Sequence, residues 1–229
     1  MTFAVPRLAP VRALVTGATG RVGRAVAERL EREGWAILRA SSVDGDLSRP
    51  NEARALVERS AAELGGLDLV VHAAGDGFEP KPVEEVTEEG WDAAFGITAK
   101  ASFFLAQAAA PHLRESRGLI VFIEDVAAYQ PWPSFAAHCA AKAAQAMLTR
   151  VLARAFAPDV RVCGVVPGPV AVEPGQEERR AAETLLGRVG QPEDVADAVV
   201  YLVGARYATG TSLVVDGGRL LQSSSGQRP

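Results

Sequence analysis

This chain contains few cysteines and histidines, and its basic residues do not outnumber its acidic ones. Of its 229 residues only two are cysteines, Cys139 and Cys163, and three are histidines. Two distant cysteines fit neither a metal-ligand pattern nor a disulfide framework, so we predict buried thiols and no metal site. The formal net charge of −4 gives no basic surface of the kind that nucleic acid or an anionic membrane requires. We therefore expect neither as a partner.

Targeting signals and long apolar runs are also missing. The first twelve residues, MTFAVPRLAPVR, contain two prolines and no apolar segment of a secretion signal. No stretch reads as apolar enough to cross a bilayer. We expect a cytoplasmic protein with a single domain over residues 1–229. Within it, residues 1–10 are predicted to be an N-terminal extension and residues 222–229 a frayed tail.

What the chain does contain is an alternation of short β-branched runs and longer helical segments. The runs are ALVTG, WAILRA, LDLVVHAAG, GLIVFIED, RVCGVVPG and TSLVVDGG. Runs that are apolar on both faces are typical of parallel strands covered by helices on both sides. The pattern predicts an α/β fold, a single Rossmann-type doubly wound parallel sheet of about seven strands. One long helix is expected to begin at Thr87 and to end near Pro111.

The informative residues follow the predicted strands. In such a sheet, ligands bind outside the carboxyl ends of the strands. Gly17, Gly75, Asp125 and the pair Pro167–Gly168 all stand there. The first of these turns, VTGATGRVGRAVA, places glycines between a strand and a helix, where backbone N–H groups can approach a phosphate. The pattern indicates a nucleotide-binding site.

Five segments in order carry a family resemblance. They are TGATGRVG, HAAG, a helix with lysine at position 142, VPGPV, and GQPEDVADAVVYLV followed by YATGTSLVVDGG. From about Ala13 to Gly218 the chain resembles the short-chain dehydrogenase/reductase family. The resemblance implies an oxidoreductase with a nicotinamide cofactor and a small-molecule substrate, assembled as a homotetramer or homodimer. HAAG departs from the family's more usual NNAG.

The glycine loop is a variant form. The family loop reads T-G-x-x-x-G-x-G, and here Thr16, Gly17 and Gly23 match while Arg21 takes the middle glycine position. This form is similar to pteridine reductases, in which the arginine reaches towards cofactor phosphate and substrate. Gly20 permits a second parse, T-G-x-x-G-x-x-G, of the extended branch of the family. We reject that parse because those chains are much longer and lack this C-terminal signature.

The second strand ends at RASSVDGDL, which bears on the choice of cofactor. An acid there would bind the adenosine ribose and select NAD, but Ser41 stands at that position, with Arg39 and Arg21 nearby. Hydroxyls and arginine suit a 2′-phosphate, so we predict NADP(H) in preference to NAD(H). The alternative is that Ser41 is a loop residue and Arg39 a solvated charge.

Asp46 and Leu47 resemble the pair that holds the adenine, and they come early, so the helix usually found between the second and third strands is predicted to be missing. The predicted cofactor-binding residues are Gly17, Thr19, Gly20, Arg21, Val22, Gly23, Ser41, Ser42, Asp46, Leu47, Ala73, Ala74, Gly75, Lys142, Pro167, Gly168 and Val170.

The resemblance also assigns the catalytic positions. The family uses Tyr-x-x-x-Lys together with an upstream serine and an asparagine on the long helix. Here His138 stands at the tyrosine position, Lys142 at the lysine, Asp125 at the serine and Thr98 at the asparagine. Pteridine reductases likewise carry an aspartate thirteen residues before the tyrosine. We predict that these four residues form the catalytic site.

Histidine can replace the phenol as an acid. Its ordinary pKa of about 6.5 suits proton transfer near neutrality, although an imidazole is shorter than a phenol. We predict an NADP(H)-dependent reductase acting on a small carbonyl or pterin-like substrate, with His138 as proton donor. The alternatives are a catalytically impaired nucleotide-binding protein of the same fold and a scaffold that binds no nucleotide. Tyr129 is either a second source of a phenol or a packing residue.

Overall fold

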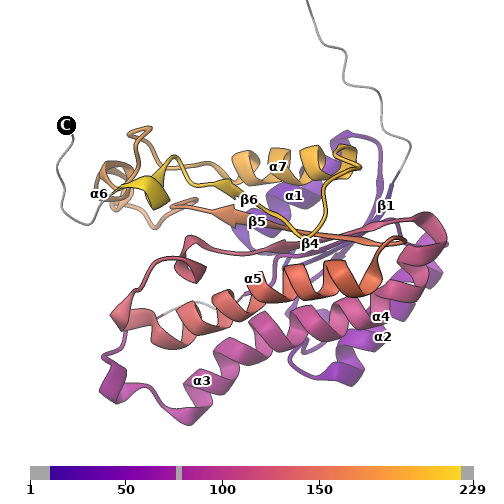
Figure 1. Cartoon of the computed structure of the whole chain (residues 1–229), viewed down its shortest axis with the longest axis horizontal. Coiled ribbons are helices and arrows are strands. Elements are labelled where there is room, and N and C mark those ends of the chain that lie inside the picture. The colour runs from indigo at the N-terminus through magenta and orange to yellow at the C-terminus, as the bar shows by residue number, and fades with distance from the viewer. Residues whose placement is uncertain (1–10, 76–78, 223–229) are drawn as a thin grey trace, which may run out of the picture.

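The computed structural model describes residues 11–75 and 79–222 (Figure 1). Within them, six parallel strands form one sheet in the order β2-β1-β3-β4-β5-β6. The α/β prediction is confirmed, with six strands in place of about seven. The difference arises after β2, where the chain between Ala40 and Asp46 forms only a short 3-10 helix, Ser42–Asp44, and no strand. The helix predicted to be missing before Asp46 is absent, whereas α2 (Pro50–Leu64), after Asp46, connects β2 to β3. Residues 1–10 and 223–229, predicted as extension and tail, lie outside the described residues.

The strands are short and most are enclosed. They are β1 (Arg12–Thr16), β2 (Ala36–Ala40), β3 (Leu69–His72), β4 (Leu119–Ile123), β5 (Arg161–Pro167) and β6 (Ser212–Val215). Every residue of β3 and β4 is buried, because helices cover both faces of the sheet at its centre. Because all six strands are parallel, their carboxyl ends lie along the same edge of the sheet, and the candidate residues follow the strands at that edge.

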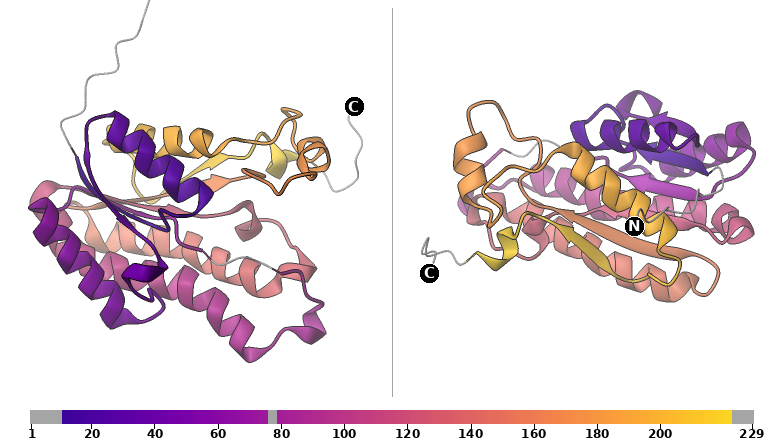
Figure 2. Two further views of the ribbon diagram at one scale, coloured as in Figure 1. Left: turned by 180° about the vertical axis from the view of Figure 1, so that it is seen from behind. Right: turned by 90° about the horizontal axis from the view of Figure 1, so that it is seen from above.

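Two helical layers sandwich the sheet (Figures 1 and 2). One layer contains α1 (Arg21–Arg32) and α7 (Pro192–Gly204). The other contains α2 (Pro50–Leu64), α3 (Glu88–Phe95), α4 (Ala101–Ser116) and α5 (Ala136–Phe156), and the short α6 (Glu177–Ala182) lies beyond β5. One apolar core fills the space beneath each layer, and side chains of alternate strand residues enter each core in turn.

The long helix predicted from Thr87 extends further than expected. The Thr87 hydroxyl accepts the N–H of Gly90 at 3.2 Å and so caps α3, as predicted. α3 continues through a π-helical segment, Gly96–Lys100, into α4, which passes Pro111 and ends at Ser116. The predicted end near Pro111 is wrong, because proline removes only one N–H from a helix that packs firmly against α2.

The same helix bears on the prediction that no segment is apolar enough to cross a membrane. By length and composition alone, Glu88–Ser116 meets that criterion, the one helix among the described residues that does. Some 44% of its most apolar window is buried within the protein. Its place between α2 and α5 is that of a core helix.

Candidate active site

The loop between β1 and α1 has almost no room for side chains. Gly17 has φ of +68°, and a Cβ there would lie 2.6 Å from the backbone of Ala73 and Ala74. A Cβ at Gly23 would lie 2.2 Å from the carbonyl oxygen of Gly17. Both positions therefore require glycine, which lets α1 begin directly against the ends of β1 and β3.

The N-terminus of α1 is suited to an anion. Its N-cap, Gly20, has no side chain to satisfy the first N–H groups, and the first turn carries no acid. The first N–H groups of a helix have no partners within it, and together they carry a partial positive charge. Thr19 and Val22 flank this end, and a Cβ at Gly75 would meet nothing within 4 Å. These residues fit the diphosphate of a dinucleotide.

Arg21 links the glycine loop to the segment after β5. Its guanidinium donates to the carbonyls of Ala171 and Val172, the latter at 3.0 Å, and forms an ion pair with Glu173 at 2.8 Å. The same segment begins with Gly168, where a Cβ would lie 2.7 Å from Cα of Asp216. The predicted Pro167–Gly168 turn therefore packs directly against the end of β6.

The predicted 2′-phosphate residues are bonded to protein carboxylates. The backbone N–H and hydroxyl of Ser41 donate to Oδ2 of Asp44 at 2.9 and 3.3 Å. The other carboxylate oxygen of Asp44 accepts from Arg59 at 2.9 Å. Arg39 forms a two-point ion pair with Glu31, with its shorter contact at 2.6 Å. The positive charge of Arg39 is thus compensated within the protein.

The predicted adenine pair, Asp46 and Leu47, has a local structural role. Oδ1 of Asp46 accepts from the N–H and hydroxyl of Ser48 at 3.0 and 2.6 Å, and these bonds lower the pKa of Asp46. Leu47 is 7% exposed and packs in the core beside α2. Ser42 lies exposed nearby in the 3-10 helix. Asp46 thereby holds the turn that leads into α2, a role that sequence reasoning missed.

Three of the four predicted catalytic residues meet at the carboxyl end of β4. His138 and Lys142 lie on successive turns of α5 and are both buried. Nε2 of His138 lies 3.4 Å from Oδ2 of Asp125. The other oxygen of Asp125 accepts the N–H of Ala127 at 2.8 Å, which fixes the carboxylate in place.

The Nζ of Lys142 is buried among backbone and amide oxygens. Its ammonium donates to the carbonyl of Ile123 at 2.8 Å and to Oε1 of Gln145 at 3.1 Å. Burial lowers the pKa of Lys142, and the carboxylates of Asp125 and Glu124 oppose that effect. The cluster therefore combines an imidazole, an ammonium group and an oriented carboxylate.

Thr98, the fourth predicted catalytic residue, lies in the π-helical segment and is 2% exposed. Its carbonyl oxygen accepts from the hydroxyl of Ser102 at 2.6 Å, and Ser102 in turn accepts from Gln145 at 2.8 Å. Thr98 is thus joined to Lys142 through its backbone oxygen. π-Helical turns occur frequently at functional sites, because they move backbone groups out of register.

His72 is a buried residue that sequence reasoning did not place in the site. Its Nδ1 lies 2.9 Å from Oγ1 of Thr16, and its Nε2 lies 3.1 Å from the carbonyl oxygen of Ile97. A carbonyl can only accept, so Nε2 carries the hydrogen and Nδ1 accepts from the Thr16 hydroxyl. Burial lowers the pKa of His72 to about 4. A neutral imidazole therefore ties the π-helical segment to the sheet, and the histidine of HAAG was the available signal.

Tyr129 interacts with Glu124. The Glu124 side chain is 2% exposed, and it accepts from Thr149 at 2.6 Å and from the Tyr129 hydroxyl at 3.5 Å. Burial raises the pKa of Glu124. The contact directs the phenol to Glu124, which favours the packing interpretation of Tyr129 over its interpretation as a proton donor.

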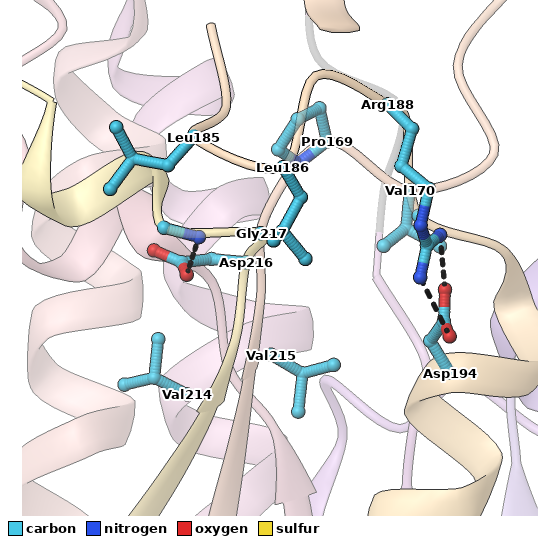
Figure 3. Close-up of a pocket in the computed structure, with 12 residues that line it drawn as sticks. Pro169, Val170, Leu185, Leu186, Arg188, Asp194, Val214, Val215, Asp216 and Gly217 are labelled. Carbon is cyan, nitrogen blue, oxygen red and sulfur yellow. Dashed lines mark hydrogen bonds and ion pairs between the residues drawn. The ribbon is translucent and has the colours of Figure 1, made fainter.

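A pocket of about 410 Å³ lies beside the segment after β5 (Figure 3). Pro169, Val170, Leu185 and Leu186 line it, and the Arg188–Asp194 ion pair, at 2.9 Å, stands at one side. Of the predicted site residues only Val170 lines this pocket, so it is separate from the cluster around His138. Among the residues that the structure describes, no three potential metal ligands gather.

Comparison with known proteins decides the family. The family described as Enoyl-(Acyl carrier protein) reductase matches residues 15–219. A 4-formylbenzenesulfonate dehydrogenase of Comamonas testosteroni is 33% identical over 243 residues, which cover 90% of this chain and 96% of that protein. This chain belongs to the short-chain dehydrogenase/reductase family.

Solved structures of the family agree. A short-chain dehydrogenase/reductase of Brucella melitensis, described as a glucose/ribitol dehydrogenase, has a TM-score of 0.82 and 30% identity over 91% of this chain and 96% of its own. A blue fluorescent protein from a metagenomic library, in complex with NADPH, has a TM-score of 0.81 and 27% identity over 90% of this chain and 96% of its own. Like its relatives, this short-chain dehydrogenase/reductase is an oxidoreductase.

Proposed function

We propose that this protein is an NADPH-dependent reductase of a small carbonyl or pterin-like substrate, with His138 as the proton donor. The observation that carries the proposal is the cluster of His138, Asp125 and Lys142 at the carboxyl end of β4, with the 3.4 Å approach of the imidazole to the carboxylate. An oxidoreductase that adds hydride to a carbonyl carbon also needs an acid for the oxygen, and His138 is the acid at this place.

The glycine loop fits the diphosphate of the cofactor. The uncapped N-terminus of α1 would hold the diphosphate through the backbone around Gly20, and Lys142 would hold the nicotinamide ribose. The NADPH complex of the metagenomic relative supports a nicotinamide cofactor. Ser41, in place of an acid at the end of β2, supports the preference for NADPH. The carboxylate of Asp44, which Ser41 contacts, has its negative charge offset by the Arg59 guanidinium. When bound, the reduced nicotinamide supplies the hydride.

The chain's own residues divide the remaining work. His138 would give a proton to the oxygen of a carbonyl substrate, or to the ring nitrogen of a pterin, when hydride adds to the carbon bonded to that atom. Asp125, fixed by the Ala127 N–H, orients the imidazole. Lys142, whose Nζ donates to the carbonyl of Ile123 and to Oε1 of Gln145, lies one helical turn after His138 on α5. The imidazole is almost fully enclosed, at 4% exposure, so proton transfer is shielded from bulk water.

Aromatic side chains near α5 favour a flat substrate. The rings of Trp132 and Phe135 meet edge to face with centroids 6.1 Å apart, and the Arg219 guanidinium lies 5.7 Å from the Trp132 ring. Arg219 also pairs with Glu183, which holds it over the indole. A planar heterocycle such as a pterin is the substrate class that best matches stacking surfaces near an acid.

The test is NADPH oxidation with a panel of pterins, quinones and carbonyls between about pH 5 and pH 8, around the ordinary pKa of imidazole. We expect turnover above that of a Lys142→Ala variant. Tight NADPH binding without turnover would favour the impaired nucleotide-binding protein instead. If calorimetry detects no NADPH binding, the proposal is contradicted, and the remaining interpretation is a scaffold that binds no nucleotide.

We also propose a homodimer or homotetramer assembled through the layer of α3, α4 and α5. Large apolar side chains are exposed there, with Trp91 at 41%, Met147 at 54% and Val151 at 50%. Apolar exposure gathered on one face is typical of a protein interface. Light scattering of the purified protein tests the proposal, and a monomer at micromolar concentration would contradict it.

A further inference from the structure

A row of hydrogen bonds crosses the core behind Lys142. Its Nζ donates to Oε1 of Gln145 at 3.1 Å, and Nε2 of Gln145 donates to Oγ of Ser102 at 2.8 Å. The Ser102 hydroxyl then donates to the carbonyl of Thr98 at 2.6 Å. Gln145 and Ser102 are fully buried, and each contact is a direct hydrogen bond.

The direction of these bonds follows from their last member. The Thr98 carbonyl can only accept, so the Ser102 hydroxyl gives its hydrogen to that carbonyl and accepts the Gln145 amide N–H. The amide oxygen of Gln145 must then face the ammonium group. The N–H of Gln145 and the O–H of Ser102 both point away from Lys142. The oxygen atom of each group, the negative end of its dipole, therefore faces the ammonium group. An amide oxygen is not a base at neutral pH, so this row orients Lys142 and does not carry its protons away.

We propose that Gln145 is a positioning residue for Lys142, because its amide oxygen, held by Ser102, sets where the ammonium group stands for the cofactor ribose. The inference rests on the proposed function, since it assigns Gln145 to the same site. An ammonium group has three N–H bonds, and Ile123 and Gln145 accept two of them at 2.8 and 3.1 Å. The third is left for a ribose hydroxyl, with the more distant Glu124 carbonyl at 3.5 Å as its present acceptor.

The ionisable groups around Lys142 come from three elements. Glu124 and Asp125 follow β4, His138 lies one turn earlier on α5, and His72 ends β3. Burial favours the uncharged amine, whereas the two carboxylates favour the ammonium group. Gln145 adds a fixed neutral acceptor to this balance. Removing its oxygen should therefore make Lys142 easier to deprotonate.

The cofactor-free protein allows a direct test, because the chain has only three lysines, Lys81, Lys100 and Lys142. With lysine labelled at Cε, NMR follows each titration, and Lys142→Met assigns the third signal. In Gln145→Leu we expect the Lys142 midpoint to fall by about one pH unit, the size of one lost hydrogen bond to a charged group. Gln145→Glu should raise it, and neither variant should move the other two lysines.

Two serines provide a matched control. Ser102 and Ser60 are both fully buried, and each hydroxyl donates to the carbonyl four residues earlier, at 2.6 and 2.7 Å. Only Ser102 also accepts from Gln145. Ser102→Ala should lower the Lys142 midpoint and weaken NADPH binding severalfold, whereas Ser60→Ala should cost stability alone.

The outcomes separate this inference from the proposed function. In Gln145→Leu we expect the KM for NADPH to rise about tenfold, more than kcat falls, with the alkaline limb of the pH profile displaced to lower pH. An unchanged Lys142 midpoint in folded Gln145→Leu and Gln145→Glu, with normal NADPH turnover, would overturn the inference alone. Shifted midpoints in a protein that binds no NADPH would overturn the proposed function and leave Gln145 as a structural partner of Lys142.

Discussion

Arg21 and Glu173 form an ion pair at 2.8 Å that joins the loop after β1 to the segment after β5. The two strands are separated in the sheet by β3 and β4. The arginine that replaces a loop glycine therefore holds a carboxylate at the place where a diphosphate is expected.

Replacing Glu173 by Gln should release Arg21 for the cofactor. We expect the Kd for NADPH and for NADH to fall by a similar factor of about two to five, because the cofactor no longer has to break one exposed ion pair to reach Arg21. Fluorescence titration measures both constants. Glu177→Gln, which removes an exposed acid at the start of α6, is the control. Weaker binding in Glu173→Gln alone would contradict this interpretation.

Cofactor preference should respond to two substitutions, one directly after β2 and one in α1 at the ion pair with Arg39. Ser41→Asp places a carboxylate where the adenosine ribose is expected, and should shift the ratio of kcat/KM values towards NADH by at least tenfold. Glu31→Gln breaks the ion pair with Arg39 and should shift the ratio towards NADPH. Steady-state kinetics with both cofactors check the pair. Equal effects on both cofactors would refute the assignment.

The reach of the imidazole is testable by restoring a phenol. We expect His138→Tyr to raise kcat by up to about a hundredfold, because a displacement of one ångström in a reacting group can cost that much. His138→Ala should lower turnover to the level of Lys142→Ala. If His138→Ala keeps the activity of the natural protein, His138 is not the proton donor.

His72 should govern the acid stability of the fold. Burial lowers the pKa of His72 from the ordinary value of about 6.5 to about 4, so between these pH values the folded state holds the imidazole neutral while the unfolded chain protonates it. Above about pH 6.5 this histidine costs the folded state nothing. As the pH falls from about 6.5 towards 4, the free energy of unfolding decreases by about 3 kcal/mol in all. His72→Asn should remove this part of the loss. Urea unfolding of both proteins at several pH values measures it.

The sequence predicted the strands and the glycine loop well, because their patterns are local. It overestimated the number of strands, since the segment between Ala40 and Asp46 is too short for another helix and strand. The end of α4 was misplaced because packing against α2 outweighs the one N–H lost at Pro111.

Within the candidate site, the cluster of His138, Lys142 and Asp125 could be predicted from helical spacing and family position. The partners of Arg21 and Arg39 could not, because Glu173 is 152 residues from Arg21 in the chain and only the folded protein brings them together. Gln145 could have been found, since it lies three residues after Lys142 and such pairs meet on a helix. The sequence alone gave no sign that the amide would face the ammonium group.

The outermost position of β2 has a consequence for how this enzyme could diversify. In the part of the chain that the structure describes, no strand lies beyond β2, and the rim where adenosine is expected is a short surface turn, Ser42–Asp44, with no buried residue. We therefore expect substitutions in this turn to change the preference between NADPH and NADH with little effect on folding. His138 and Lys142 are buried on α5, so we expect substitutions at these positions to affect folding as well as activity.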